Sequence, residues 1–528
     1  MVFDYIIVGA GAAGCLLANR LSEDPACRVL LLEAGGKDDH KHIHIPVAFS
    51  KLFRSAYDWA YQTVPQPYLF NRELYQPRGK VLGGSSSINA MIYIRGHRAD
   101  YDQWASLGNR GWDYESVLPY FRRFESNLQF DDAFHGKGGE LTVSEGRHHH
   151  LLSHRLLEAA AQAGYPLNED FNGKEQEGFG FYQVTQRAGR RCSAATAFLE
   201  PALHRPNLEV QTQAHAHRIL LSGRRATGMV YEREGAMQQA QASREVLLCA
   251  GSFGSPHLLM LSGIGPASAL RDHGVPLAHH LPGVGQNLQD HLLAGCVYQT
   301  NRRDTLDSLE RFPFSLKYLW QYLVHKRGML ASNVAECGGF LRSLPNLAAP
   351  DLQWHFSPGF FLRHGFENPK KGNGLGLGMT LIAPFSKGEV RLQSADPRDK
   401  LMIDPQYCSD ERDLHTLLRG YRITERIMSQ PALKPYLQER FMPAPGVATE
   451  GEILHYLKGW VQTLYHPVGT CKMGQDEKAV VDASLRVWGI DQLRVVDASI
   501  MPVIVRGNTN APSMMIAEKA AAMIQGQP

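Results

Sequence analysis

Residues Asp4–Gly36 read DYIIVGAGAAGCLLANRLSEDPACRVLLLEAGG, and the order of apolar runs and glycines within them indicates how the chain folds. A short apolar run ends in the glycine pattern Gly9–Gly14, and a helical pattern follows it. A second apolar run, Val29–Leu32, ends at Glu33. A strand, a glycine-rich turn, a helix and a strand with an acid at its tip are typical of a dinucleotide-binding unit. The sequence therefore predicts a Rossmann-like α/β fold that begins near the N-terminus.

Each part of this unit has a physical role. Gly9 permits the tight turn, Gly11 lets the backbone approach a pyrophosphate, and Gly14 lets the helix lie close to the sheet. The helix N-terminus offers free N–H groups and a partial positive charge to the pyrophosphate. Glu33 can accept hydrogen bonds from the ribose hydroxyls of an adenosine. This motif alone does not separate FAD from NAD, so the rest of the chain must decide.

Length and composition exclude several classes of protein. A chain of 528 residues is too long for one ordinary core, so two or more domains are expected. The net charge of +3 is too small to indicate a nucleic-acid partner. The eight cysteines form no C-x-x-C pair, which indicates neither a metal site nor a disulfide framework. Without a secretory signal or an apolar run of membrane-spanning length, the sequence predicts a cytoplasmic protein.

A second dense signal lies at Gly79–Asp102, GKVLGGSSSINAMIYIRGHRADYD. Gly83 and Gly84 precede three serines, so backbone and hydroxyl groups can approach a bound ligand closely. The strand-like run Met91–Ile94 follows. A plain linker is the alternative, but a linker would not be flanked so tightly by apolar residues.

The end of the chain repeats the pattern of its beginning. A mostly apolar strand over Leu493–Val496 ends in a polar tip, and a last helix covers Ser513–Met523. Between the two units, Leu352–Phe356, Gly378–Ile382 and Gly388–Leu392 read as strands of an antiparallel sheet. We therefore expect a discontinuous nucleotide-binding domain and a substrate domain of antiparallel sheet with helices. The expected boundaries are 1–155, 204–300 and 481–528 for the first domain, and 156–203 and 301–480 for the second.

Phe314–Val324 is an amphipathic, aromatic-rich helix candidate. Lys317, His325, Lys326 and Arg327 give it a basic edge. It is either a core helix of the second domain or a contact with a membrane surface. We favour the core helix, because buried helices are far commoner than interfacial ones.

Four motifs together resemble the glucose-methanol-choline (GMC) oxidoreductase family. They are the glycine fingerprint, the Gly79–Asp102 stretch, GSFGSPHLLMLSGIG at Gly251–Gly265, and the pair HPVGTCKMG at His466–Gly474 and NTNAP at Asn508–Pro512. They extend over nearly the whole chain, and in this order they are highly specific. The bacterial branch that looks most similar contains alkanol and choline dehydrogenases.

The resemblance implies an FAD enzyme that oxidises alcohols. The histidine of the family's HP-x-GT motif faces the flavin, which indicates His466, and Asn510 is the position matched to its partner. The cofactor-binding residues that the motifs imply are Gly9, Gly11, Ala12, Ala13, Gly14, Glu33, Ala34, Gly84, Ser85, Asn89, Ala90, Met91, Ile92, Ala216, Ala250, Gly251, Tyr465, Asp497, Ala498 and Asn508. Some members attach FAD covalently through a histidine just before the asparagine of the Gly-Ser motif. Ile88 stands at that place, so we expect the FAD to be non-covalent.

The expected reaction follows from the chemistry of alcohols. The flavin accepts a hydride, His466 takes the hydroxyl proton as base, and the amide of Asn510 donates to the oxygen. Aromatic residues suggest an apolar pocket for an aliphatic or aromatic primary alcohol: Trp320, Phe360, Phe361, Phe366 and Tyr465. Choline stays open as a substrate, because an aromatic cage also holds a quaternary ammonium group.

The expected partners are a small alcohol and a quinone or another electron acceptor, without nucleic acid. An oxidase that forms hydrogen peroxide is the alternative, since the same site serves both. A redox-silent FAD module and a NAD-dependent reductase fit the motifs less well. The basic helix leaves open a peripheral contact at the inner face of the membrane, and the oligomeric state is not readable from the sequence.

Overall fold

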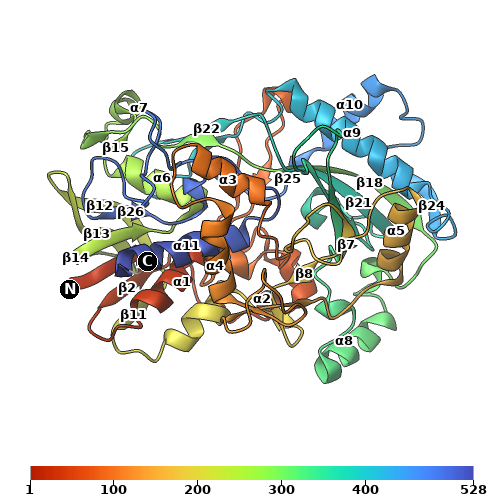
Figure 1. The fold of residues 1–528 in the computed structure, drawn as a ribbon, viewed down its shortest axis with the longest axis horizontal. Coiled ribbons are helices and arrows are strands. Elements are labelled where there is room, and N and C mark those ends of the chain that lie inside the picture. The colour runs from red at the N-terminus through yellow and green to blue at the C-terminus, as the bar shows by residue number, and fades with distance from the viewer. Residues whose placement is uncertain (1, 527–528) are drawn as a thin grey trace.

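The computed structural model describes residues 2–526. The chain folds into two lobes that lie side by side (Figure 1). Each lobe is built on a seven-stranded sheet. The first sheet has the order β11-β2-β1-β14-β13-β12, and β26 also pairs with β14. Its strands are β1 (Val2–Val8), β2 (Val29–Leu32), β11 (Leu208–Gln211), β12 (Ala214–Ser222), β13 (Arg225–Arg233), β14 (Ala236–Leu248) and β26 (Leu493–Val495).

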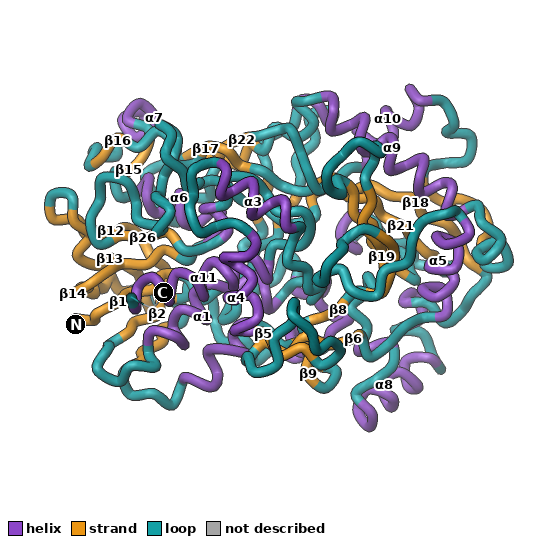
Figure 2. The backbone as a smooth tube through the Cα atoms, in the orientation of Figure 1, coloured by secondary structure: helices purple, strands orange, loops and turns teal. Residues whose placement is uncertain are grey.

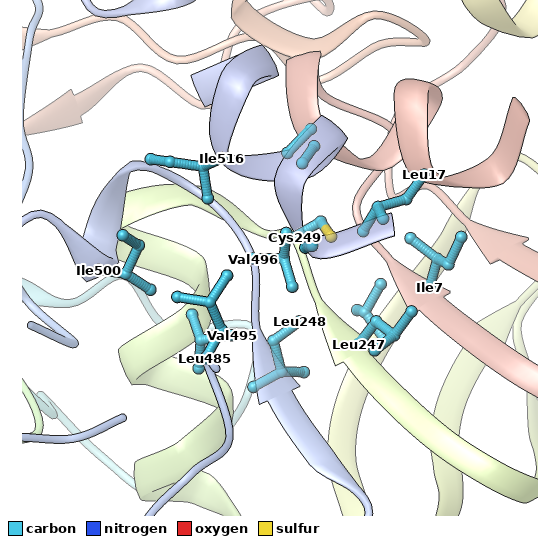
Figure 3. Packing of buried hydrophobic residues seen from close by; sticks show 14 of the residues in the cluster. Ile7, Leu17, Leu247, Leu248, Cys249, Leu485, Val495, Val496, Ile500 and Ile516 are labelled. Carbon is cyan, nitrogen blue, oxygen red and sulfur yellow. The ribbon is translucent and has the colours of Figure 1, made fainter. Parts of the chain in front are cut away.

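The first sheet is parallel at its centre, where β11, β2, β1, β14 and β26 run in the same direction. The predicted buried run at the end of β1 is confirmed, since Ile6 and Ile7 are fully buried. Helices α1 (Ala12–Leu21) and α11 (Asn510–Gln525) pack together over this region. Figure 3 shows Leu17 of α1 and Ile516 of α11 above the strand residues Leu248 and Val495. The two ends of the chain therefore share one core.

The second sheet is antiparallel, as predicted for the substrate domain. Its order is β24-β18-β21-β20-β19-β7, and β25 also pairs with β18. Helix α9 (Glu411–Met428) packs on β21, while α5 (Leu151–Gln162) and α10 (Glu450–Trp460) pack on α9. Figure 2 shows this sheet in the half of the molecule opposite the N-terminus. Its strands are β7 (Gly178–Phe181), β18 (Leu292–Thr300), β19 (Cys337–Leu341), β20 (Leu352–Ser357), β21 (Gly374–Leu381), β24 (Leu437–Met442) and β25 (Gln462–Thr463).

Two expected strands differ in the structure. Gly388–Leu392 was expected in the large antiparallel sheet, but β22 (Gly388–Arg391) belongs to a separate three-stranded sheet with β17 (Gln286–Leu288) and β23 (Met402–Asp404). Met91–Ile94 forms no regular strand, and only Ile92 makes an isolated bridge, with Val184. The segment of β22 is paired with β17 and β23, and its residues Val390 and Leu392 pack in the core of the first lobe, so it does not join the large antiparallel sheet.

The domain boundaries stay a prediction. The ranges 1–155 and 481–528 include residues 1 and 527–528, which lie outside the described residues. Strand β18 falls in the range 204–300 expected for the first domain, and its pairing partners are in the second sheet.

The remaining elements are short and connect these layers. The helices are α2 (Lys41–His44), α3 (Arg98–Ser106), α4 (Tyr114–Phe124), α6 (Gly251–Leu261), α7 (Ala267–Asp272) and α8 (Phe314–His325). The strands are β3 (Tyr61–Gln62), β4 (Tyr75–Gln76), β5 (Glu125–Asn127), β6 (Leu141–Glu145), β8 (Gln183–Val184), β9 (Gln186–Arg187), β10 (Arg190–Arg191), β15 (Ile264–Gly265) and β16 (His279–His280). Two 3₁₀ turns that matter below are η3 (Gly84–Ser87) and η7 (Met329–Ala331), and η1 covers Pro46–Leu52.

Helix α8 is not the core helix that we expected. It projects from the second lobe at the lower right of Figure 1. Leu316 is 60% exposed and Trp320 is 59% exposed, so the prediction of a buried helix is wrong. Within residues 2–526, no helix combines the length and the apolar character that crossing a membrane requires.

Candidate active site

One cavity runs from the glycine turn of the first lobe to the antiparallel sheet of the second. His466 and Asn510 line it, and so does every predicted cofactor-binding residue except Gly14. Gly14 has a different role, because a Cβ on it would lie 1.9 Å from the carbonyl oxygen of Gly9. Helix α1 can therefore pack this closely on the turn only because Gly14 has no side chain.

The glycine turn forms a narrow cradle at the first end of the cavity. A Cβ on Gly84 would lie 2.7 Å from the Cα of Gly11, so η3 and the start of α1 touch through their backbones. Gly11 is the N-cap of α1, and no side chain caps that helix end. The free N–H groups of a helix N-terminus attract an anion such as a pyrophosphate. The cradle thus fits the diphosphate of a dinucleotide.

Glu33 is 5% exposed at the tip of β2. Its Oε2 accepts a hydrogen bond of 2.9 Å from the backbone N–H of Ala10, and its Oε1 accepts one of 2.8 Å from that of Gly35. Burial raises the pKa of this carboxyl to about 7, against these two hydrogen bonds. A carboxylate has further lone pairs, so Glu33 can hold the turn and still accept from a ribose hydroxyl.

At the other end of the cavity, Asp290 places two histidines. Its Oδ1 accepts from the backbone N–H of His466 at 2.8 Å and from that of His291 at 2.9 Å. Its Oδ2 accepts from Thr463 at 2.6 Å and also from Tyr407. The carboxyl is buried, and all of these donors satisfy it. Asp290 therefore joins the start of β18 to the segment that follows β25.

The His466 imidazole has a contact at each ring nitrogen. Its Nδ1 lies 3.0 Å from the Nδ1 of His291, and its Nε2 lies 3.3 Å from the Nδ2 of Asn508. Two neutral imidazoles that meet through Nδ1 atoms share one proton between those atoms, so one donates and the other accepts. The tautomers follow from the partner of Nε2.

A chain of hydrogen bonds fixes the orientation of Asn508. The carbonyl of Trp354 can only accept, so the Tyr182 hydroxyl donates to it. The Tyr182 oxygen therefore accepts a hydrogen bond of 3.3 Å from Nε2 of the Gln353 amide. Nε2 of Gln353 also donates to Oδ1 of Asn508 at 3.2 Å. The NH₂ group of Asn508 must therefore face His466. Nε2 of His466 is the acceptor, and its proton sits on Nδ1.

In the structure the hydrogen-bond partner of His466 Nε2 is Asn508, whereas Asn510 was expected at this place. Asn510 is the first residue of α11 and lines the cavity, but among the described residues it has no hydrogen bond to His466. The sequence motifs instead place Asn508 among the cofactor-binding residues. The loop before α11 brings it to the imidazole, and the helix start carries Asn510 past it.

Burial keeps the histidines of this site neutral. Desolvation lowers the pKa of His466 well below 6.5, and the neighbouring His291 and Arg78 lower it further. Burial likewise lowers the pKa of His291 and of His355 to about 3. A neutral imidazole with a free lone pair on Nε2 is a proton acceptor.

The backbone near His466 is held in uncommon conformations. Met91 has φ 59°, Val334 has φ 73° and Tyr465 has φ 71°, and all three residues line the cavity. Residues other than glycine rarely adopt this left-handed backbone conformation, and a β-branched residue such as valine adopts it least often. Such strain persists where the surrounding structure enforces it, and it gathers at functional sites.

The second lobe supplies apolar walls, partly from the predicted aromatic residues. Phe361 and Tyr465 line the cavity, beside Phe49, Phe53 and Trp460. The other three expected pocket residues do not line it: Phe360 is buried in the core of the second lobe, Phe366 is 42% exposed, and Trp320 lies on α8.

Sequence reasoning missed the residues that orient the site: Gln353, Asp290 and His291. The Asp-His pair at 290–291 stands directly before β18, and a polar pair at a strand start is a usable signal. Nothing local singles out Gln353, which faces inward from β20.

Comparison with known families agrees with this geometry. The GMC oxidoreductase family is matched by an N-terminal model over residues 3–293 and by a C-terminal model over residues 384–517. Alcohol dehydrogenase (acceptor) of Pseudomonas putida is 46% identical, over 99% of this chain and 96% of its own length. Mitochondrial choline dehydrogenase of Mus musculus is 45% identical, over 100% of this chain and 90% of its own.

Solved structures with the same fold cover both chains almost completely. Pyridoxine 4-oxidase from Mesorbium loti has a TM-score of 0.90 at 34% identity, with 100% of each chain covered. A formate oxidase of Aspergillus oryzae, altered to study FAD modification, has a TM-score of 0.93 at 29% identity, covering 99% of this chain and 98% of its own. The predictions of the α/β fold, of an oxidoreductase and of FAD as cofactor are confirmed. The chain belongs to the GMC oxidoreductase family.

Proposed function

We propose that this protein oxidises an uncharged primary alcohol, aliphatic or aromatic, to the aldehyde. In this proposal the electrons pass to a quinone or to another acceptor that is not oxygen. The observation that carries the proposal is the pair of His466 Nε2 and Asn508 Nδ2, 3.3 Å apart on the cavity wall. The pair offers one acceptor and one donor to the same hydroxyl group.

The protein residues handle the proton of the substrate. Nε2 of His466 accepts the hydroxyl proton, and the NH₂ of Asn508 donates to the oxygen as negative charge develops on it. The imidazole then carries protons on both nitrogens, and its Nδ1–H stays hydrogen-bonded to the neutral acceptor Nδ1 of His291. In this proposal Asn508 takes the donor role that the motif had suggested for Asn510.

FAD, when bound, supplies the acceptor for the hydride that leaves the carbon. The cradle of Gly11 and Gly84 would hold its pyrophosphate, and Glu33 would accept from its ribose. The apolar walls around Phe53 and Phe361 exclude water from the reacting groups, so that charges within the site interact more strongly.

The charge of the cavity favours an uncharged alcohol over choline. Of the described residues that line it, the carboxylates are Glu33, Asp399 and Asp497. Glu33 holds the glycine turn, and Asp497 accepts from Gly251 and Ser255 at the start of α6. The second lobe contributes Arg363, whose guanidinium lies 4.6 Å from the ring centre of Trp460. A quaternary ammonium group would meet a cation there instead of an anion.

Two further features of the proposal concern the cofactor and the acceptor. Ile88 is buried on the cavity wall, and its side chain has no atom that can bond to a flavin, which supports non-covalent FAD. The 46% identity with a dehydrogenase named for an acceptor supports transfer to a carrier other than oxygen. The solved oxidases of the family are more distant, at 34% and 29% identity.

The test is a panel of alcohols with an artificial acceptor, run with and without oxygen. The panel contains linear primary alcohols, benzyl alcohol, choline and pyridoxine. We expect turnover of the linear or aromatic alcohols with the artificial acceptor, and little peroxide without it. Faster turnover of choline would contradict the substrate, and peroxide formed as fast as alcohol is consumed would contradict the acceptor.

A further inference from the structure

Helix α8 turns its apolar side outward. Its exposed apolar residues are spaced as one helical face. They are Leu316 (60% exposed), Leu319 (47%), Trp320 (59%), Leu323 (60%) and Val324 (59%). Phe312, just before the helix, is 79% exposed. We call these six residues the apolar stripe. In an ordinary surface helix such a stripe faces the core, so an outward stripe marks a surface that meets a partner.

Two tyrosines hold the helix in this orientation. Tyr318 and Tyr322, one turn apart, are each 5% exposed and face the body of the protein. The Tyr318 hydroxyl lies 3.2 Å from the Ser308 hydroxyl. The apolar stripe thus stays outward because the opposite face of the helix is already packed.

The surroundings of the stripe are basic. Residues 311–335 contain no Asp or Glu, and they carry Arg311, Lys317, His325, Lys326 and Arg327. Arg311 also donates to the carbonyl of Gly372 at 2.8 Å, which brings the exposed Lys370 and Lys371 beside the base of the helix. Glu310, the acid that precedes this stretch, is paired with Lys51.

We propose that α8 docks on the surface of an anionic lipid bilayer, with the apolar stripe inserted and the cations against the headgroups. A helix of 12 residues is about 18 Å long, which suits a position in the plane of the interface. Tryptophan beside lysine and arginine is the combination that interfacial helices use. A second copy of this chain is a poorer occupant, because a symmetric contact would bring the same cations face to face.

Docking would place the bilayer near the cavity. Helix α8 packs against η7, and Asn333 and Val334, which follow η7, line the cavity. Leu306, which precedes α8, packs in the cluster that contains the cavity residues Phe49 and Phe53. The inference stands on α8 alone and does not depend on which alcohol is oxidised.

The experiment is flotation of the FAD-loaded enzyme with two kinds of vesicle. One kind contains phosphatidylglycerol and phosphatidylethanolamine, and the other contains phosphatidylcholine only. We expect wild type to float with the anionic vesicles and to be released by high salt, because screening weakens the attraction to the headgroups. The double variant Trp320→Glu/Leu323→Glu should float at least tenfold less. Lys317→Gln/Arg327→Gln should lose several-fold on anionic vesicles only.

A matched control changes equally exposed apolar residues elsewhere. Met237 on β14 is 56% exposed and Leu277 is 52% exposed, and Met237→Glu/Leu277→Glu should float like wild type. All variants should keep wild-type turnover with a soluble acceptor, which shows that they are folded. The proposal is overturned if wild type does not float, if the α8 variant floats like wild type, or if α8 substitution only splits a dimer.

Discussion

The imidazole Nε2 of His466 and the amide Nδ2 of Asn508 lie 3.3 Å apart across a separation of 42 residues in the chain. The acceptor on the histidine and the donor on the asparagine therefore meet at one point of the cavity wall. His466 follows β25 of the second sheet, and Asn508 precedes α11 of the first lobe. This pair of side chains is therefore formed at the junction of the two lobes.

Substitution of the two asparagines should separate their roles. Asn508→Ala removes a hydrogen bond to a group that becomes charged, which is worth about 1.5 to 3 kcal/mol, or about 10- to 150-fold in rate. Asn510→Ala leaves the His466 contact intact and should change the rate only a few-fold. Anaerobic stopped-flow measurement of flavin reduction compares the two. A larger loss in Asn510→Ala than in Asn508→Ala would restore the assignment that the motif suggested.

His466→Ala should lower the rate of flavin reduction by about 10² to 10⁴, the usual contribution of a general base. FAD should stay bound, since the glycine turn is unchanged. The pKa of His466 is lowered well below 6.5, so the base is neutral throughout the neutral range. The wild-type rate should be flat with pH above about 6.5 and fall only in more acid solution, as the imidazole gains a proton. Reduction within a few-fold of wild type in His466→Ala would place the base elsewhere.

The sequence predicts the nucleotide unit well because its signals are local. The strand, the glycines and Glu33 lie within one βαβ segment, and their spacing fixes their geometry. The choice between Asn508 and Asn510 is not local. It depends on α11 starting at Asn510 and on Gln353, which is 155 residues away from Asn508.

The direction that α8 faces could not be read from its pattern. The spacing of Leu316, Trp320 and Leu323 predicts an amphipathic helix whichever way it is turned. Packing of Tyr318 and Tyr322 against the body decides the orientation, and that contact exists only in the folded lobe.

Gln353 should act as a positioning residue through Asn508. Gln353→Leu removes the donor to Asn508 Oδ1, and a neutral hydrogen bond of about 0.5 to 1.5 kcal/mol predicts a loss of about 2- to 10-fold in flavin reduction. Gln353→Glu places an acceptor against that oxygen and should cost more, because Asn508 then turns its NH₂ away from His466. In the Asn508→Ala background both changes should become nearly silent. Full additivity with Asn508→Ala would assign Gln353 a purely structural role.

The flavin should leave the protein on acid denaturation. Ile88 is 3% exposed on the cavity wall and offers no nucleophile. Precipitation with acid should therefore release all the yellow colour into the supernatant, which absorbance measures directly. Colour that remains in the washed pellet would reveal a covalent bond from another residue.

The affinity for FAD should depend on pH through Glu33. In the free site burial raises the pKa of this carboxyl to about 7, whereas a ribose hydroxyl that donates to it favours the carboxylate. FAD binding then releases a proton below pH 7, so the affinity should fall by up to tenfold for each pH unit below about 7 and level off above it.

Glu33→Gln keeps one acceptor oxygen but cannot hold both Ala10 and Gly35 as a carboxylate does. The variant should bind FAD more weakly, and its affinity should vary little between pH 5.5 and pH 8. Equilibrium titration of FAD-free protein with FAD, followed by flavin fluorescence, gives both dissociation constants. Equal pH dependence in wild type and Glu33→Gln would assign the proton to another group of the nucleotide site.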